Sequence, residues 1–204
     1  MKTKHLAMLL SNLESHPQQD ISLEQYQTDG DLAARWLTVL SHHHGVEGLR
    51  IADLGSGNGI LGIGCLLLGA SHVSFFEVDE RAVKVLQKNL KSFPQTMYDV
   101  IQTSVSGDTT LPTDVDAIIM NPPWGVQTQK ADRPFLDLAF TSEAKRIHLL
   151  HSSESKHLED ISSHYGWFGT KLFNDHFRLP QAYQHHKSRQ QTTKVSCWSF
   201  SKQE

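Results

Sequence analysis

Four consecutive residues, Asn121-Pro122-Pro123-Trp124, place an amide and a large aromatic ring directly after an apolar run. Neither proline can donate to a β-ladder and each restricts the residue before it, so together they end a strand abruptly. The Asn121 amide can donate two hydrogen bonds and accept at its oxygen. The run is therefore a predicted strand end that also presents an amide and an aromatic ring to a ligand.

A glycine-rich segment, ADLGSGNGI at 52–60, lies where a predicted strand meets a predicted helix, which is where open α/β sheets bind ligands. Gly55 and Gly57 allow the backbone to turn tightly and to approach a ligand closely. Ile60 stands where a dinucleotide fingerprint requires its third glycine, which argues against NAD and FAD. No Lys-Ser/Thr pair follows, which excludes a P-loop. The Asp53 carboxylate suits a cationic or amine-bearing ligand better than pyrophosphate.

Glu77 ends the second predicted strand, about twenty residues after the loop, where a carboxylate can accept hydrogen bonds from both ribose hydroxyls. The loop, Glu77 and the run at 121–124 therefore predict a site for an adenosine ligand without pyrophosphate. The alternative interpretation is a set of turn glycines with a solvated glutamate.

The predicted elements that carry these residues alternate between buried strands and amphipathic helices. Strands are predicted at 49–55, 72–79, 98–105, 115–121, 147–153, 169–179 and 192–200, and helices at 4–14, 31–40, 59–70, 80–89, 132–145 and 155–166. Asp31 and Asp79 are the predicted starts of their helices. The pattern predicts an α/β fold with a parallel sheet covered on both faces, closed at one edge by an antiparallel pair.

The composition fits one globular domain over 1–204, with helices and the LEQYQT segment in 1–45 and a core with a basic C-terminal hairpin in 46–204. No apolar run approaches the ~18 residues of a membrane span, and the start lacks a signal-peptide pattern, so we expect a cytoplasmic protein without a membrane partner. Thirteen histidines occur without HExxH or CxxC spacing, so no metal is predicted.

Two of these motifs resemble those of class I S-adenosylmethionine-dependent methyltransferases. DLGSGNG resembles their first motif, and Asn121-Pro122-Pro123-Trp124 resembles the (N/D/S)PP(Y/F/W) motif of the amino-methyltransferases. In those enzymes the Asn side chain and the first Pro carbonyl accept hydrogen bonds from a planar NH2 group, on which the aromatic ring stacks. The resemblance implies a Rossmann-like seven-stranded sheet, S-adenosylmethionine as cofactor, and a catalytic role for these four residues.

Further segments are similar to the archaeal and eukaryotic ribosomal-RNA adenine N6-methyltransferases, the METTL5-like family. LEQYQT at 23–28 is similar to the family's LEQYPT, and IMNPPWG, DRPFLDLAF, IHLLHSS and LPQAYQHHKSR match its order and spacing. The resemblance runs from about Leu6 to Phe200. It implies N6-adenine methylation of RNA, in small-subunit ribosomal RNA. Guanine N2, cytosine N4, protein glutamine and a cofactor-binding scaffold without turnover stay open as alternatives.

The same resemblance implies which residues meet the cofactor. Some of these residues lie over the cofactor, and others line its methionine and ribose side. Ser104 and Val105 flank its adenine. The full implied set is Gln25, Tyr26, Thr28, Asp53, Gly55, Gly57, Asn58, Ile60, Glu77, Ser104, Val105 and Asn121.

Three positions depart from the family pattern. Ser104 replaces an aspartate, so its contact with the cofactor's adenine amine would lack charge assistance. Gln27 replaces a proline, which leaves that loop less rigid. Trp124 replaces the commoner phenylalanine, which keeps stacking and enlarges the ring.

The resemblance also implies partners. His186, Lys187 and Arg189 fall in a segment like the family's basic region and are predicted to meet the RNA backbone, with a solvated loop as the alternative. For His151, RNA contact and ordinary edge-strand polarity are both open. Eukaryotic family members work with a small zinc-binding activator protein that pairs along a sheet edge, and such a partner is an expectation here.

Overall fold

Strands and helices alternate along the chain as the sequence predicts. The computed structural model describes residues 1–15, 27–124, 129–155, 157–178 and 192–202. Its helices are α1 (Thr3–Ser11), α2 (Gly30–His44), α3 (Ile60–Leu67), α4 (Glu80–Asn89), α5 (Arg133–Thr141) and α6 (His157–His164), with a short 3-10 helix η2 (Gln95–Met97). Its strands are β1 (Arg50–Leu54), β2 (His72–Glu77), β3 (Tyr98–Gln102), β4 (Ala117–Met120), β5 (Arg146–Ser152), β6 (Trp167–Arg178) and β7 (Thr192–Lys202).

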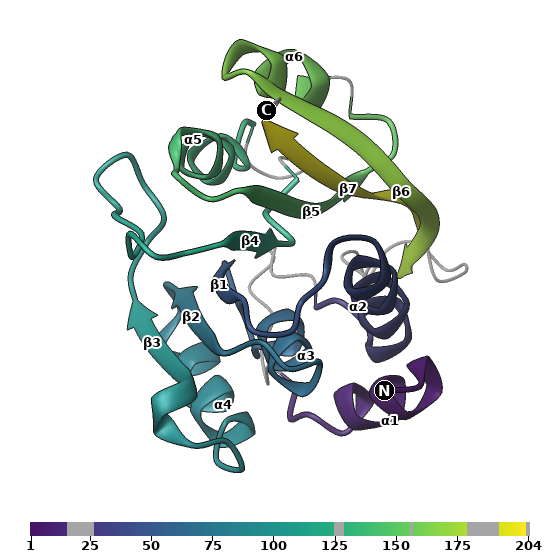
Figure 1. Ribbon diagram of the computed structural model, residues 1–204, viewed down its shortest axis with the longest axis vertical. Coiled ribbons are helices and arrows are strands. Elements are labelled where there is room, and N and C mark those ends of the chain that lie inside the picture. Colours follow the sequence, from purple (N-terminus) through teal and green to yellow (C-terminus); the bar gives the residue numbers. More distant parts are fainter. Residues whose placement is uncertain (16–26, 125–128, 156, 179–191, 203–204) are drawn as a thin grey trace, which may run out of the picture.

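These strands form one seven-stranded sheet in the order β3-β2-β1-β4-β5-β7-β6 (Figure 1). The strands β3, β2, β1, β4 and β5 run parallel, whereas β7 runs antiparallel to both of its neighbours, β5 and β6. The predicted antiparallel pair therefore closes one edge of a parallel sheet, and the predicted seven-stranded α/β fold is confirmed.

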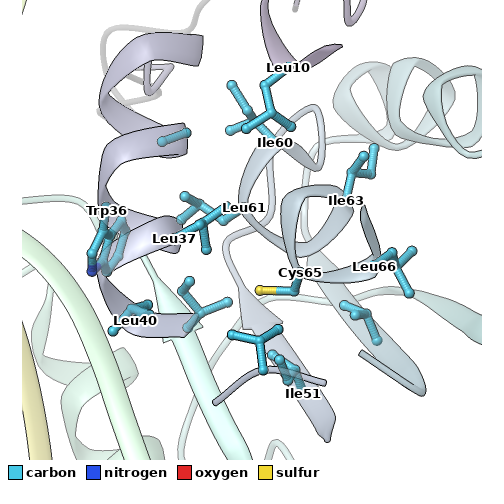
Figure 2. Close-up of a cluster of buried hydrophobic side chains, with 14 of the residues drawn as sticks. Leu10, Trp36, Leu37, Leu40, Ile51, Ile60, Leu61, Ile63, Cys65 and Leu66 are labelled. Carbon is cyan, nitrogen blue, oxygen red and sulfur yellow. The ribbon is translucent and has the colours of Figure 1, made fainter. Parts of the chain in front are cut away.

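Two apolar cores lie on opposite faces of the sheet, because successive side chains of a strand point to opposite sides. Ile51 of β1 packs into a core shared with α1, α2 and α3, whereas its neighbour Ala52 packs into a core shared with α5 and α6. Figure 2 shows the first core, where the side chains of Leu37 and Leu61 lie between α2 and α3. Helices therefore pack against both faces of the sheet.

Side-chain caps set the start of two helices. The Asp79 carboxylate accepts a hydrogen bond from the Arg81 N–H at 2.8 Å and caps α4, as predicted. For α2 the predicted start at Asp31 is wrong, since Asp29 is the N-cap and accepts from the Leu32 N–H at 2.8 Å. Asp31 instead lies in the first turn, where a carboxylate interacts favourably with the helix dipole.

None of the helices within the described ranges is long and apolar enough to cross a bilayer. Cys65 and Cys197 are both buried and free, and burial raises the pKa of each thiol. Neither thiol is therefore in a reactive environment.

Candidate active site

The register of three neighbouring strands brings the predicted site residues into one row. Leu54 of β1 is paired with Phe76 of β2 and with Met120 of β4. The residues that follow these three are Gly55, Glu77 and Asn121. The glycine loop, the acidic residue and the Asn-Pro-Pro-Trp run therefore start at the same level, at the carboxyl edge of the sheet, where α/β folds place their ligands.

The glycine loop is fixed by backbone hydrogen bonds to β2. The N–H groups of Gly55 and Ser56 both donate to the Phe76 carbonyl at 2.9 Å. Gly57 has a left-handed backbone with φ of 56°, and a methyl group added there would meet no atom within 4 Å. Its Cα therefore faces open space, which leaves room for a ligand to lie against the backbone.

The Glu77 carboxylate is held by three backbone N–H groups. One oxygen accepts from Gly57 at 2.7 Å, and the other accepts from Val78 and Asp79, each at 2.9 Å. The side chain is only 6% exposed. These bonds fix a carboxylate beside the open face of the glycine loop, a position similar to that of the acidic residue that binds ribose in dinucleotide-binding folds.

Asp53 lies beneath the loop and ties it to α3. Its side chain is 1% exposed, and its Oδ2 accepts from the Gly62 N–H at 2.8 Å. Burial raises the pKa of this carboxyl to about 7; the hydrogen bond from Gly62 opposes the rise and the charge of Glu77 adds to it. In this structure Asp53 connects β1 to the first turn of α3.

Asn58 joins the glycine loop to the N-terminal segment. Its side-chain N–H donates to the Glu14 carbonyl at 3.0 Å. Asn89, at the end of α4, completes the junction, since its amide donates to the carbonyls of Glu14 and Asn58 at 3.1 and 3.0 Å and accepts from the Glu14 N–H at 2.9 Å. We call these residues, Glu14, Asn58 and Asn89, the N-terminal clamp.

Asn121 is held between Thr28 and Trp124. Its Nδ2 donates to the Thr28 hydroxyl at 3.1 Å, and its Oδ1 accepts from the Trp124 indole N–H at 3.2 Å. Because an indole N–H can only donate, the amide oxygen must be the atom that faces Trp124. The contact also brings the last residue of the LEQYQT segment, 93 positions away, against the Asn-Pro-Pro-Trp run.

The Trp124 ring packs between two other rings. Phe177 of β6 meets it edge-on, with ring centroids 5.1 Å apart, and His151 of β5 lies 6.0 Å away at a tilt of 32°. The orientation of the ring therefore depends on β5, which pairs with the antiparallel strand β7, and on β6, the end strand of the sheet. Pro122 is buried under the turn, and Pro123 is partly buried.

Behind His151 lies a polar cluster that sequence reasoning missed. The Asp132 carboxylate is hydrogen-bonded to Nε2 of His151 at 3.1 Å and to Nε2 of His157 at 2.6 Å. Burial raises the pKa of Asp132, but the hydrogen bonds from both histidines outweigh it and leave that pKa below its usual value. Nothing in the spacing of these residues shows that they meet.

Some of the remaining predicted site residues lie in the described part of the chain, and the others lie outside it. Val105 and Ile60 are buried, Ser104 is exposed after β3, and the Ser104 carbonyl accepts from the Thr109 hydroxyl at 3.1 Å. Five predicted residues lie outside the described part of the chain: Gln25, Tyr26, His186, Lys187 and Arg189.

The chain is similar in sequence and in structure to known methyltransferases. The sequence profile of the methyltransferase small domain matches residues 30–150. The chain is 29% identical to the rRNA N(6)-adenosine-methyltransferase METTL5 of Danio rerio, over 93% of each protein. It is 32% identical to an uncharacterised protein of Methanocaldococcus jannaschii, over 93% of this chain and 89% of that one. The crystal structure of a proposed RNA methyltransferase of Pyrococcus horikoshii superposes with a TM-score of 0.89 at 35% identity, over 99% and 98% of the two chains.

Proposed function

The chain belongs to the methyltransferase small domain family, whose members use S-adenosylmethionine, and we propose that it methylates adenine N6 in ribosomal RNA. The observation that carries the proposal is the Asn121 amide, fixed at the end of β4 between Thr28 and Trp124. Full-length similarity to a named rRNA N(6)-adenosine-methyltransferase supports adenine as the base and ribosomal RNA as the substrate. We place the target in the small-subunit RNA.

The residues at the carboxyl edge of the sheet fit the cofactor. Glu77, fixed by three backbone N–H groups, would hold the ribose hydroxyls, and the open face at Gly57 leaves room for the cofactor against the loop. Ser104 and Val105 would flank the adenine beyond β3. When bound, S-adenosylmethionine supplies a methyl group on a positively charged sulfur, so the protein does not need to build a reactive group of its own.

The protein's own part in the reaction is to hold the amine. The Asn121 Oδ1 and the Pro122 carbonyl accept hydrogen bonds from the exocyclic NH2, which draws its lone pair out of conjugation with the ring. Trp124 stacks on the base and fixes its plane. The amine loses its proton after the transfer, so no strong base is required. A paired adenine cannot reach Trp124, so we expect a single-stranded or loosened RNA segment as the substrate.

We further propose that a small zinc-binding activator protein pairs along one end of the sheet. The strands β3 and β6 end the strand order, and an end strand offers backbone groups to an added strand. The expected result is a higher methylation rate when the activator is co-purified. An unchanged rate together with no co-purification would remove this part of the proposal.

Incubation with labelled cofactor tests the substrate directly. The wild-type chain is offered separate pools of ribosomal RNA and ribosomal protein, and the labelled product is digested and identified by mass spectrometry. The proposal expects label in N6-methyladenosine. Label in N2-methylguanosine, in N4-methylcytidine or only in protein would replace adenine with another amine.

Asn121→Ala separates catalysis from a scaffold role. We expect methyl transfer to fall about 100-fold or more, the size of effect seen when one fixed hydrogen-bonding group of an active site is removed. Calorimetric titration with S-adenosylmethionine checks that the variant still binds cofactor. If the wild type binds cofactor and Asn121→Ala modifies RNA at the same rate, the residue has no catalytic role.

A further inference from the structure

Three potential metal ligands converge from three separate elements beside the Trp124 ring. Asp132 is the N-cap residue of α5, His151 lies near the end of β5, and His157 is the first residue of α6. One ligand atom from each lies within 4.8 Å of the others. Two imidazoles and one carboxylate form a donor set that binds divalent transition metals. We call these three residues the His–Asp–His cluster.

Both ring nitrogens of His151 have hydrogen-bond partners, which fix the orientation of the ring. Its Nδ1 is hydrogen-bonded to the Ser155 hydroxyl at 2.5 Å, while its Nε2 faces Asp132. Because Nε2 donates to Asp132, Nδ1 accepts from the Ser155 hydroxyl. A metal at Nε2 would shift the ring proton to Nδ1, which would then donate to Ser155, the kind of outer partner that ligating histidines use. Ser155 thus supplies the outer partner for a metal bound at Nε2.

Burial and charge favour a cation at this position. The Asp132 and His151 side chains are 7% and 1% exposed, whereas His157 is 45% exposed and offers a route from solvent. Arg133, the neighbour of Asp132, is paired with Asp137 at 2.8 Å and does not neutralise Asp132. Asp132 is the one carboxylate of the cluster, and its buried oxygens offer hard ligand atoms of the sign that attracts a divalent cation.

The distances are close to those of a bound site. In tetrahedral zinc sites each ligand atom lies about 2.0–2.2 Å from the metal, which separates neighbouring ligand atoms by about 3.3 Å. Here the carboxylate oxygen lies 3.1 Å from the His151 nitrogen and 2.6 Å from the His157 nitrogen. The carboxylate–His157 separation is the shorter of the two, and His157 is half exposed at the start of α6, so we expect its ring to move outward when the ion binds.

We propose that Asp132, His151 and His157 form a binding site for a divalent transition metal, zinc by preference, with one coordination position left to solvent. The metal would join the starts of α5 and α6 to the end of β5. It would also fix the His151 ring, which packs against Trp124 with centroids 6.0 Å apart. Zinc binding is measured without RNA or cofactor, so this proposal can fail while the proposed function holds, and the reverse.

Zinc titration of the tag-free, full-length chain tests the site. After treatment with a chelator, the wild type is titrated with zinc chloride by calorimetry, and its metal content after dialysis is measured by mass spectrometry. We expect one zinc per chain, and cobalt substitution should give the visible absorption of a tetrahedral site. Absence of stoichiometric zinc in the wild type would overturn the proposal.

His157→Ala and His164→Ala are the matched pair of variants, because these histidines lie at opposite ends of α6 and both are exposed. Loss of His157 should weaken zinc binding at least 10-fold and abolish the rise of Tm caused by zinc. Loss of His164 should change neither. If both variants bind zinc as the wild type does, the ion lies elsewhere and the cluster is a hydrogen-bonded group without metal.

Discussion

At the level of single residues, Trp124 donates a hydrogen bond from its indole N–H to the Asn121 Oδ1 at 3.2 Å, and we propose that its ring also stacks on the target base. Trp124→Ala removes both roles, and we expect kcat/KM for RNA to fall about 10- to 100-fold because stacking on one base contributes ~1–3 kcal/mol. Trp124→Phe keeps a stacking ring and loses only the indole N–H, so its loss should stay within 10-fold. Steady-state kinetics on ribosomal RNA measures both. Equal losses in the two variants would show that the hydrogen bond, and not stacking, matters.

Asp53 makes stability depend on pH in a direction opposite to that of a salt-bridged aspartate. Burial raises its pKa from 3.8 to about 7, so the folded state holds a proton that the unfolded state releases above pH ~4. The stability that the raised pKa of Asp53 provides is greatest below about pH 4. It is lost as pH rises from about 4 to about 7, and above that pH it no longer changes. Asn at this position is uncharged and can still accept from the Gly62 N–H.

Urea unfolding of the wild type and of Asp53→Asn between pH 4.5 and 8 measures this dependence. The wild type should lose stability relative to the variant as pH rises, by about 3 kcal/mol over this range, since each unit of pKa shift corresponds to about 1.36 kcal/mol. Effects of other groups cancel in the difference. A difference that does not change with pH would show that Asp53 is ionised in the folded protein.

Among the elements, the glycine loop offers two positions with similar backbones and different surroundings. Gly57 and Gly59 have φ of 56° and 86°, but a methyl at Gly57 meets nothing within 4 Å, whereas one at Gly59 collides with the Leu86 side chain. Gly59→Ala should therefore destabilise the protein by about 3 kcal/mol or more, from strain and overpacking together. Gly57→Ala should cost only about 1–2 kcal/mol of left-handed strain.

For cofactor affinity we expect the opposite order, with Gly57→Ala affected more than Gly59→Ala. The reason is that the methyl of Gly57→Ala projects toward the expected position of S-adenosylmethionine. We expect its Kd to rise at least 10-fold by calorimetry, while folded Gly59→Ala protein binds nearly as tightly as the wild type. Wild-type affinity in Gly57→Ala would place the cofactor away from the loop.

The N-terminal clamp predicts how the first helix is attached to the loop. Asn89→Ala removes the acceptor of the Glu14 N–H and the bond that Asn89 donates to the Asn58 carbonyl, while the Glu14 carbonyl keeps its bond from Asn58. We expect a loss of about 1 kcal/mol together with faster hydrogen exchange at the Glu14 amide. Lys88→Ala is the control, since its ion pair with Glu14 is more than half exposed and such pairs contribute little. Equal exchange rates in both variants would contradict a clamp role for Asn89.

Elements and loop motifs were predictable because periodicity and turn residues are local signals. The strands at 50–54 and 117–120, and the helix cap at Asp79, follow from such patterns. The predicted start of α2 lies one residue after the observed start at Gly30, because two aspartates, Asp29 and Asp31, can each cap a helix. The His–Asp–His cluster could not be predicted, because its members meet only after three elements pack.

For the whole molecule, the shared register of β2, β1 and β4 brings together three motifs that lie far apart in the sequence. It sets Gly55, Glu77 and Asn121 at one level, so that a cofactor on the loop and an amine beside Asn121 are neighbours. The N-terminal segment completes the arrangement from outside the sheet, through Thr28 and Glu14. The sequence predicted the participating strand ends, whereas contacts as distant as Thr28 with Asn121 required the folded chain.

The proposed reaction is tested most directly by the nucleosides of ribosomal RNA in cells that lack the gene. Small-subunit RNA is digested and its N6-methyladenosine measured by mass spectrometry after deletion, and again after complementation with the wild type or with Asn121→Ala. The proposal predicts that deletion removes this nucleoside and that only the wild type restores it. An unchanged level after deletion, or full restoration by Asn121→Ala, would contradict adenine methylation at Asn121.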